Sequence, residues 1–266
     1  MTQINPVVDA SSGDVATPVL QARALGHAYG SRQVLQGLDF HVGRGELMCI
    51  VGPSGVGKTT LLECLTGLRR PTDGKVLFDG KEIDSPPRGL AIVFQDYSRS
   101  LMPWLSVIDN VTLPLRSAGM GKAEREKVAV EALTEVGLAD FTDSYPWQLS
   151  GGMQQRVAIA RALAYRPDAI VMDEPFASVD AQTRADLEDL LLRVRDHLGI
   201  TIILVTHDID EAVYLSDRVL ALGGKPAGIR EVLTVDLPSP REQVATKALP
   251  RFAELRSHVY RLIRNV

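Results

Sequence analysis

The chain has 266 residues, of which 45% are hydrophobic and 23% are charged, a globular composition that can bury a sizeable core. This composition excludes a disordered chain and a disulfide-stapled miniprotein, and the two cysteines, Cys49 and Cys64, are predicted to be buried free thiols. With 29 basic against 33 acidic residues the formal net charge is −4, so we expect no nucleic-acid surface and only local phosphate binding. The length predicts one large α/β domain or a core with an insert.

The start of the chain, residues 1–18, lacks the basic residues and apolar stretch of a secretory signal. We predict that it is a flexible polar extension. No apolar run approaches the roughly 20 residues that a helix needs to cross a bilayer. The sequence therefore predicts a cytoplasmic chain that does not itself span a membrane.

Between Val19 and Val51, short apolar runs broken by glycines predict antiparallel strands that lead to a buried strand over Leu47–Val51. The turn pairs Asp73-Gly74 and Asp79-Gly80 bracket a further predicted hairpin strand. The next predicted elements are a helix over Lys58–Leu68 and a strand over Leu90–Phe94.

Residues from about 98 to 166 are predicted to be mostly helix and loop, with an amphipathic helix over Lys122–Val136, and form a candidate inserted subdomain. Parallel-sheet patterns return afterwards. They predict a strand over Ala169–Met172, a helix over about Gln182–Leu198, a strand over Thr201–Val205 and short strands around Gly223-Gly224.

The C-terminal stretch is predicted to be a helix docked on the domain, because its apolar residues share one helical face. These residues are Phe252, Leu255, Val259, Leu262 and Ile263. The same stretch, Pro238–Val266, is the one locally basic segment. A solvated flank is the main expectation for its charges, and contact with anionic lipid or with the cytoplasmic loops of a membrane protein is the alternative.

A phosphate-loop pattern, G-x-x-x-x-G-K-[ST], occurs between the apolar strand and the first helix. Its members are Gly52, Pro53, Ser54, Gly55, Val56, Gly57, Lys58 and Thr59. The glycines let successive N–H groups and the positive end of the helix face a phosphate. We expect Lys58 to reach the β- and γ-phosphates and the Thr59 hydroxyl to bind Mg²⁺.

Two acids, Asp173 and Glu174, stand directly after an apolar strand, where a parallel sheet presents its binding edge. Paired acids on a loop are usually only solvated, but their place downstream of a phosphate loop favours a function. Asp173 suits the Mg²⁺ shell, and Glu174 can polarise a water for in-line attack on the γ-phosphate.

The segment Leu149–Arg156 places two glycines, Gly151 and Gly152, at the start of a helix that Ser150 can cap. Glycine inside a helix costs up to about 1 kcal/mol relative to alanine. The pair is explained if bare N–H groups must approach an anion. The alternative is an ordinary capped amphipathic helix that runs to about Tyr165.

Together these motifs resemble the nucleotide-binding subunit of ATP-binding cassette (ABC) transporters, over essentially Val19–Leu237. The resemblance implies an α/β fold with a P-loop NTPase core, an antiparallel β subdomain and an inserted α-helical signature subdomain. It places this ATPase domain at residues 19–237 and a C-terminal helical extension at 238–266. Leu149–Arg156 looks like the family's signature motif, which completes the ATP site of a partner subunit.

The resemblance also implies roles for single residues. Tyr29 would stack on adenine, although a strand-end tyrosine half buried in the sheet is the alternative. Gln95 would touch Mg²⁺ and the attacking water, and His207 would contact the γ-phosphate and orient that water. The implied catalytic residues are thus Glu174, His207 and Gln95, and the implied metal ligands are Thr59, Gln95 and Asp173. Further implied nucleotide contacts are Thr60, Ser150, Gly151, Gly152, Gln154 and Asp180, the last in the loop through which partners communicate.

The implied activity is hydrolysis of ATP, with Mg²⁺, by two copies arranged head to tail. Because the chain has no spanning segment, the resemblance implies a separate transmembrane permease and, indirectly, a solute-binding protein. The chain would then lie peripherally at the cytoplasmic face of the inner membrane.

Three local stretches narrow the resemblance to importers of nitrate, sulfonate, taurine or bicarbonate: Phe94–Asp96 followed by Met102–Val107, Tyr145–Gln148, and Leu237–Arg241. Trp104 and Trp147 within them could equally be core aromatics of the insert. A non-transport ABC ATPase of DNA repair or translation would show a second cassette or a long coiled-coil insert. A non-hydrolysing switch would lack an implied catalytic residue, and a P-loop kinase or GTPase leaves the signature motif unexplained.

Overall fold

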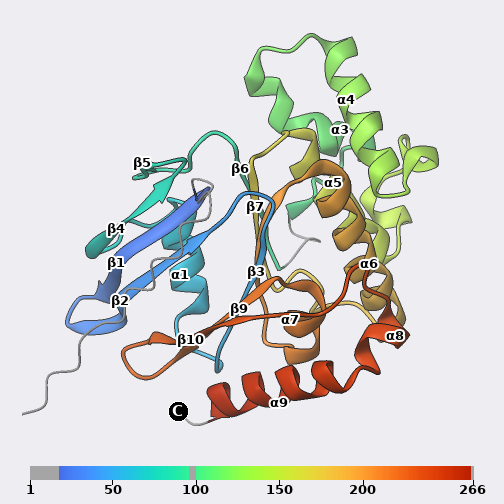
Figure 1. Ribbon diagram of the computed structural model, residues 1–266. Helices are drawn as coiled ribbons and strands as arrows, with labels where there is room; N and C mark the ends of the chain where they lie inside the picture. Colours follow the sequence, from blue (N-terminus) through green and yellow to red (C-terminus); the bar gives the residue numbers. More distant parts are fainter. Residues whose placement is uncertain (1–17, 96–99, 265–266) are drawn as a thin grey trace, which may run out of the picture.

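The computed structural model describes residues 18–95 and 100–264. Apart from Pro18, the predicted N-terminal extension, residues 1–18, lies outside the described residues. Figure 1 shows the two sheets, the helices α3 to α5 on one side of them, and α9 along the bottom. Within the described part, no helix is both long and apolar enough to cross a bilayer.

Four strands form an antiparallel sheet in the order β2-β1-β4-β5. They are β1 (Leu20–Tyr29), β2 (Arg32–Val42), β4 (Asp73–Phe78) and β5 (Lys81–Glu82). The turn Asp79-Gly80 joins β4 to β5 with φ of 46° and 75°, as a two-residue hairpin turn requires. The prediction of a similar turn at Asp73-Gly74 is wrong, because both residues belong to β4 and Gly74 packs on β1. A Cβ at Gly74 would lie 2.2 Å from the carbonyl oxygen of Ala24.

Six strands form the second sheet in the order β10-β9-β3-β8-β7-β6, parallel except for the edge strand β10. They are β3 (Leu47–Val51), β6 (Leu90–Val93), β7 (Ala169–Asp173), β8 (Thr201–Val205), β9 (Arg218–Gly223) and β10 (Gly228–Thr234). The predicted strands agree with β3 and β8 at both bounds and with β6 and β7 to within one residue. Since helices or the other sheet cover both faces, these strands are continuous apolar runs rather than alternating ones.

Strand β3 shows how the two faces of this sheet divide the core. Met48 and Ile50 face the cluster shared with the antiparallel sheet and with α1 (Lys58–Leu65). Leu47, Cys49 and Val51 face the cluster shared with the remaining helices, as the two-residue period of a strand dictates. Cys49 and Cys64 are buried free thiols, as predicted, and burial raises the pKa of Cys64 to about 11.

Helices α3 (Val107–Thr112), α4 (Lys122–Glu135) and α5 (Gly151–Ala164) pack on one another beside the second sheet (Figure 1). Short 3₁₀ turns connect them at Leu113–Ala118, Ala139–Phe141 and Pro146–Gln148. The predicted amphipathic helix agrees with α4. The interpretation of Trp104 and Trp147 as core aromatics is wrong, because each side chain is 71% exposed.

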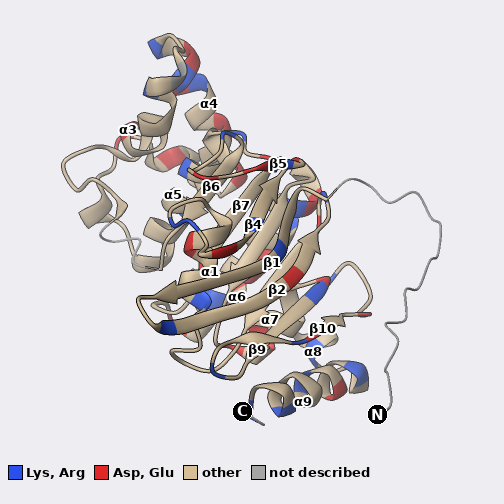
Figure 2. Cartoon of the chain, turned by 90° about the vertical axis from the view of Figure 1, so that its left-hand side faces the viewer, with Lys and Arg blue, Asp and Glu red and all other residues tan. Residues whose placement is uncertain are grey.

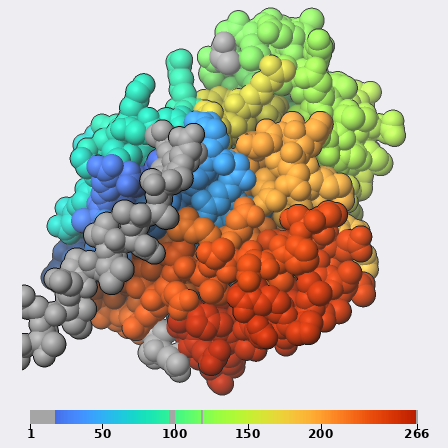
Figure 3. All heavy atoms as spheres, viewed as in Figure 1, coloured from blue at the N-terminus to red at the C-terminus, as the bar shows by residue number. Residues whose placement is uncertain are grey.

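The remaining helices are α6 (Ala181–Leu198), α7 (Ile209–Leu215), α8 (Gln243–Lys247) and α9 (Pro250–Arg264). Figure 3 shows the C-terminal segment with α9, in red, forming the lower surface of the molecule. Phe252, Leu255 and Val259 are buried in the core beneath α9, so the terminal helix docks on the domain as predicted.

The expectation that the basic C-terminal segment is a solvated flank is wrong for part of it. Arg241 is half-buried and donates from Nη1 to two carbonyl oxygens at the end of α7, at 2.6 and 2.9 Å. Lys247 pairs with Glu188 at 3.4 Å, and Arg256 lies 3.7 Å from Asp210. Figure 2 shows the basic and acidic residues interspersed along α9. These contacts fasten the C-terminal extension to α6 and α7.

Candidate active site

The candidate site lies where the carboxyl ends of four neighbouring parallel strands meet. The phosphate loop follows β3, Gln95 follows β6, Glu174 follows β7, and His207 stands two residues after β8. Because β3, β8, β7 and β6 are consecutive in the sheet, these residues come to one edge although they are far apart in sequence.

The phosphate loop bends sharply into α1 at Gly57. This residue has a φ of 115°, and a Cβ there would lie 2.9 Å from Cγ1 of Val34 on β2, so only glycine fits. No side chain caps α1, and its first turn holds no acidic residue. By contrast, side chains cap four other helices: Ser106 of α3, Ser150 of α5, Asp180 of α6 and Asp208 of α7. The N–H groups that open α1 are therefore available to an anion.

Lys58 is folded back over the loop. Its Nζ donates to the carbonyl oxygens of Gly52 at 2.9 Å and Pro53 at 3.3 Å. Burial lowers the pKa of Lys58, while the nearby Glu174 and Asp173 carboxylates act in the opposite direction. The ammonium group of Lys58 thus lies beside the loop. When a nucleotide binds, phosphate oxygens can replace the two carbonyl oxygens as its hydrogen-bond acceptors.

A cleft of about 440 Å³ opens over this loop. Its lining contains the predicted residues Tyr29, Ser54, Gly55, Gly57, Lys58, Thr59, Thr60 and Glu174. Val56 is instead buried beneath the loop. Arg32 and Val34 also line the cleft, and the sequence interpretation missed them. Their one signal was their position at the start of β2, directly after the turn that follows Tyr29.

Tyr29 stands at the end of β1 with 44% of its surface exposed, so it is half buried in the sheet and its exposed part lines the cleft. The guanidinium of Arg69 lies 4.9 Å from its ring centroid, and its hydroxyl lies 3.3 Å from Oγ1 of Thr60. The ring of His27 also packs against Tyr29, at 4.8 Å between ring centroids and nearly perpendicular to it. The exposed part of the Tyr29 ring lies at the rim of the cleft, where a base can stack.

Glu174 is the centre of the polar contacts at this edge. Its Oε2 accepts from Nε2 of Gln95 at 3.3 Å and lies 3.0 Å from Nδ1 of His207. Its backbone has a φ of 43°, an uncommon conformation for a residue other than glycine, and its N–H donates to the Val205 carbonyl at 2.8 Å. Among the described residues no hydrogen bond reaches Oε1, which is therefore available to a water.

Thr59, Gln95 and Asp173, the predicted metal ligands, offer a hydroxyl, an amide oxygen and a carboxylate. Burial raises the pKa of Asp173, the neighbouring Glu174 raises it further, and Lys58 lowers it. Thr59 is exposed to the cleft, and Gln95 is bonded to Glu174. This set of hard oxygen donors beside a phosphate loop fits Mg²⁺.

The signature residues lie at the start of α5, and none of them lines the cleft. Ser150 caps the helix as predicted, with Oγ accepting from the Met153 N–H at 3.3 Å. Gly151 is the first helical residue, and Gln154 donates to the Leu149 carbonyl at 3.2 Å. One chain thus carries a phosphate loop and a signature motif that do not meet each other.

Gly152 also has a packing role that the sequence did not reveal. It is buried against α6, where a Cβ would lie 2.3 Å from Cγ2 of Thr183. The Thr183 hydroxyl is held by Oδ2 of Asp180 at 2.6 Å, so the methyl group cannot easily turn away. Asp180 caps α6 by accepting from the N–H groups of Gln182 and Thr183. Its bond with the Thr183 hydroxyl, and after it these N–H bonds, lower the pKa of Asp180.

We expect Gly152→Ala to lower the free energy of unfolding by about 1–3 kcal/mol because the new methyl group overpacks this contact. Thr183→Ser removes only Cγ2 and keeps the hydroxyl for Asp180, so the double variant Gly152→Ala/Thr183→Ser should regain most of the loss. Urea unfolding of the wild type, both single variants and the double variant measures this coupling. Equal losses in Gly152→Ala and in the double variant would contradict the packing role.

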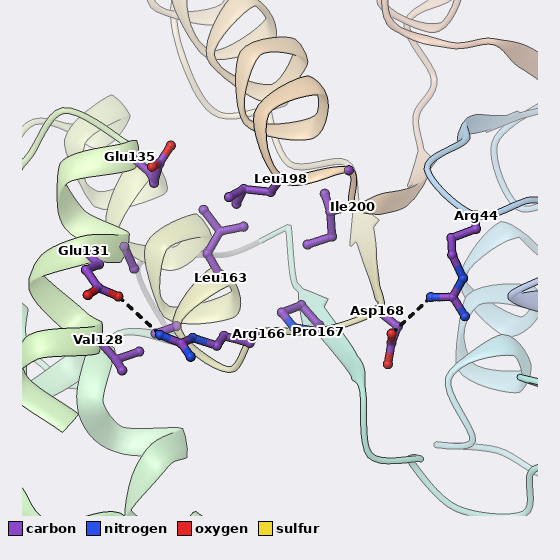
Figure 4. Close-up of a pocket in the computed structure, with 13 residues that line it drawn as sticks. Arg44, Val128, Glu131, Glu135, Leu163, Arg166, Pro167, Asp168, Leu198 and Ile200 are labelled. Atoms are coloured by element: carbon purple, nitrogen blue, oxygen red, sulfur yellow. Dashed lines mark hydrogen bonds and ion pairs between the residues drawn. The ribbon is translucent and has the colours of Figure 1, made fainter. Parts of the chain in front are cut away.

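A second hollow, of about 590 Å³, lies at the other end of the parallel strands, where the strands begin (Figure 4). It is lined by residues that precede parallel strands, such as Arg44 and Asp168, and by parts of α4, α5 and α6. Four of its charged groups form pairs across it, Arg44 with Asp168 at 3.2 Å and Arg166 with Glu131 at 3.3 Å, and Glu135 pairs with His197 at 3.0 Å. It contains none of the predicted site residues.

Comparison with known proteins agrees with this geometry. The family model described as "ABC transporter" matches residues 35–177, just over half of the chain. An aliphatic sulfonates import ATP-binding protein of Xanthomonas axonopodis pv. citri is 44% identical over 235 residues, which cover 88% of this chain and 92% of the relative. A bicarbonate transport ATP-binding protein of Synechococcus elongatus is 37% identical over 272 residues, covering 100% of this chain and 96% of the relative.

Among solved structures, a dimeric ATP-binding cassette in a post-hydrolysis state, bound to ADP and Pi, is 33% identical, with a TM-score of 0.70. The match covers 81% of this chain and 98% of that cassette. From the family model, the relatives and the fold together, the chain belongs to the ABC transporter family and is an ATP-binding subunit with ATPase activity.

Proposed function

We propose that Glu174 is the general base for ATP hydrolysis at the edge formed by β3, β6, β7 and β8. The contact of its carboxylate with both Gln95 and His207, beside the phosphate loop, carries this proposal. Oε1 of Glu174 takes the proton of a water whose oxygen attacks the γ-phosphorus in line. The bond from that phosphorus to the β,γ-bridging oxygen breaks, and ADP and phosphate leave.

The other side chains of the site stabilise the charge of the phosphate groups or orient the Glu174 carboxylate and the attacking water. The ammonium of Lys58 and the N–H groups at the start of α1 offset the negative charge that develops on the transferring group. His207 and Gln95 fix the Glu174 carboxylate and face the attacking water. Mg²⁺, held by Thr59, Asp173 and Gln95, would neutralise charge on the β- and γ-phosphate oxygens when bound. Tyr29 supplies the stacking surface for adenine.

Two copies, head to tail, form the active unit in this proposal. The placement of Ser150, Gly151 and Gly152 outside the cleft of their own chain supports it, because the exposed start of α5 can serve the γ-phosphate bound by another copy. The similar cassette bound to ADP and Pi is itself dimeric. ATP would therefore close the pair and hydrolysis would release it.

This cycle of ATP binding and hydrolysis drives the import of a small anion, such as a sulfonate, nitrate, taurine or bicarbonate, through a separate permease. The names of the sulfonate and bicarbonate relatives support this class of solute. A solute-binding protein would deliver the anion to the permease. The chain would lie at the cytoplasmic face of the inner membrane as a peripheral subunit.

Exposed aromatic residues of the insert offer a docking surface for the permease. Trp104 and Trp147 are each 71% exposed, and the loops that carry them run side by side, since the Val107 N–H donates to the Ser144 carbonyl at 2.8 Å. Tyr145 stacks on Trp147 at 6.0 Å between ring centroids. Large exposed aromatics in neighbouring loops are typical anchors of a protein interface.

We expect Trp104→Ala and Trp147→Ala each to weaken binding to the permease by about tenfold or more, as the loss of an interface anchor does. The ATPase activity of the isolated chain should change by less than about twofold, because neither ring touches the cleft. Tyr260→Ala on α9, where the ring is 47% exposed, is the matched control. Unchanged binding in both tryptophan variants would reject this surface.

Purification with the membrane partner tests the import proposal, followed by ATPase assays in liposomes with a panel of solute-loaded binding proteins. We expect one small-anion binding protein to stimulate hydrolysis. If no membrane protein co-purifies and DNA or ribosomes stimulate the activity instead, the chain serves DNA repair or translation and the import proposal fails.

A further inference from the structure

Two side chains contact the ring of Tyr29 without lining the cleft over the phosphate loop. They are Arg69, whose guanidinium lies over the ring, and His27, which meets the ring nearly at a right angle. Neither residue belongs to the lining of the cleft, whereas Tyr29 does. Arg69 and His27 therefore contact the ring from outside the cleft, and its cleft-facing part stays open to a base.

Arg69 is fixed to α1 by two contacts with Glu63. Its Nε donates to Oε2 of Glu63, and its backbone N–H donates to the Glu63 carbonyl oxygen at 3.0 Å. The side chain of Arg69 is 35% exposed, whereas that of the neighbouring Arg70 is 73% exposed. The guanidinium is therefore held in place by Glu63 as well as by the ring of Tyr29.

The segment that carries Arg69 is also fastened to β1, next to Tyr29. The Thr72 N–H donates to the Gly26 carbonyl oxygen at 3.0 Å, and Oγ1 of Thr72 accepts from the Ala28 N–H at 3.1 Å. The chain between α1 and β4 is thus anchored at both ends. This anchoring fixes the position of Arg69 relative to the ring.

Helix α1 connects the ring of Tyr29 to the phosphate loop. Oγ1 of Thr60 lies 3.3 Å from the hydroxyl of Tyr29, and Glu63, which holds Arg69, is three residues further along the helix on the same side. Lys58 and the free N–H groups stand at the start of this helix. One helix therefore carries the phosphate-binding groups and also the side chains that hold the ring.

We propose that Arg69 is a positioning residue for nucleotide binding: together with Glu63, it holds the ring of Tyr29 where adenine stacks while the start of α1 binds the phosphates. This inference rests on the proposed role of Tyr29. The guanidinium is attracted to the π electrons of the ring. A ring that is already held loses little freedom when a base stacks on it, so ATP binds more tightly.

The test measures the dissociation constants of ATP and of inorganic tripolyphosphate, each with Mg²⁺, by calorimetry. Arg69→Met keeps an apolar side chain of similar length but removes the charge and the donors. We expect it to weaken ATP binding about three- to tenfold. Tripolyphosphate has no base, so its affinity should stay within about twofold of the wild type. Arg69→Lys, which keeps a cation, should recover part of the loss.

Arg70→Met is the matched control, because Arg70 pairs with Asp84 at 2.9 Å and has no printed contact with the ring of Tyr29. Its affinity for both ligands should equal that of the wild type. Glu63→Ala is a second test variant, since alanine suits the helix but releases the guanidinium of Arg69. It should weaken ATP binding in the same direction as Arg69→Met and leave tripolyphosphate binding unchanged.

A double-mutant cycle shows whether Arg69 acts through Tyr29. In the Tyr29→Ala background, adding Arg69→Met should weaken ATP binding by less than about twofold, because the ring that Arg69 holds is absent. A residue that only supports the fold would cause its full loss in both backgrounds. In steady-state assays of Arg69→Met, KM for ATP should rise with the dissociation constant, and kcat should change less than KM.

The outcomes separate this inference from the proposed function. Unchanged ATP affinity in Tyr29→Ala would reject stacking on Tyr29, and the role of Arg69 with it. If Tyr29→Ala weakens ATP binding but Arg69→Met and Glu63→Ala do not, the positioning role of Arg69 is overturned and stacking stands. Equal losses for ATP and tripolyphosphate in Arg69→Met, or full additivity with Tyr29→Ala, would also overturn it.

Discussion

Glu174→Gln is expected to lower kcat by about 10²–10⁴-fold, the usual contribution of a general base. The amide has the shape of the carboxylate and its oxygen can still accept from Gln95 and lie against His207, but it cannot take a proton from water. ATP affinity should therefore stay within about threefold of the wild type. Because release follows hydrolysis in the proposed cycle, the variant should accumulate as a dimer when ATP is added. Steady-state ATPase assays, nucleotide binding and light scattering measure the three quantities.

Glu131→Gln is the matched control for this substitution. It removes a carboxylate that pairs with Arg166 at 3.3 Å on the rim of the hollow at the other end of the parallel strands (Figure 4). We expect wild-type turnover from it. Turnover at the wild-type rate in Glu174→Gln would reject Glu174 as the base, and loss of ATP binding would show that its main role is structural.

The second large effect is complementation between two inactive variants. Lys58→Ala loses the ammonium at the phosphate loop, and Ser150→Asp puts a negative charge where a partner's γ-phosphate should approach. Asp caps a helix as well as Ser does, so the cap on the Met153 N–H and the fold should survive. Each variant alone should lose about 10²-fold or more of its turnover, as the loss of one charge-stabilising donor does.

A mixed dimer of these variants contains one site with both lesions and one site with neither. Random pairing makes about half of the dimers mixed, so an equal mixture should regain roughly a quarter of the wild-type turnover. Activity assays at increasing ratios of one variant to the other measure the recovery, and thermal unfolding checks that both variants fold. Wild-type turnover by Ser150→Asp alone would contradict a head-to-tail site.

Local patterns in the sequence were enough to predict much of the fold. The strands β3 and β8 were predicted at both bounds because a strand covered on both faces is a short, continuous apolar run. The cap at Ser150 and the free thiols also followed from neighbouring residues. The prediction of a turn at Asp73-Gly74 was wrong because glycine is needed there for another reason. In β4, Gly74 packs closely against the bulged part of β1, where a larger side chain would not fit.

The contacts of the candidate site depend on strand order, which a local pattern does not contain. Glu174, Gln95 and His207 meet because β6, β7 and β8 are neighbours in a parallel sheet. Their pairing was expected only through resemblance to a family. Arg32 and Val34 were missed because their one signal, the position directly after the turn that follows Tyr29, does not show which side of β2 meets the phosphate loop.

The sequence by itself determined the phosphate loop, the acids after β7 and the capped glycines of α5, because each depends on consecutive residues and on the backbone they favour. Only the tertiary structure decided that Gly152 must be glycine to fit Thr183, that Trp104 and Trp147 are exposed, and that Arg69 lies over the ring of Tyr29. These properties depend on which distant segment covers a residue. Burial then sets both the space that a side chain has and the free energy of its charged form.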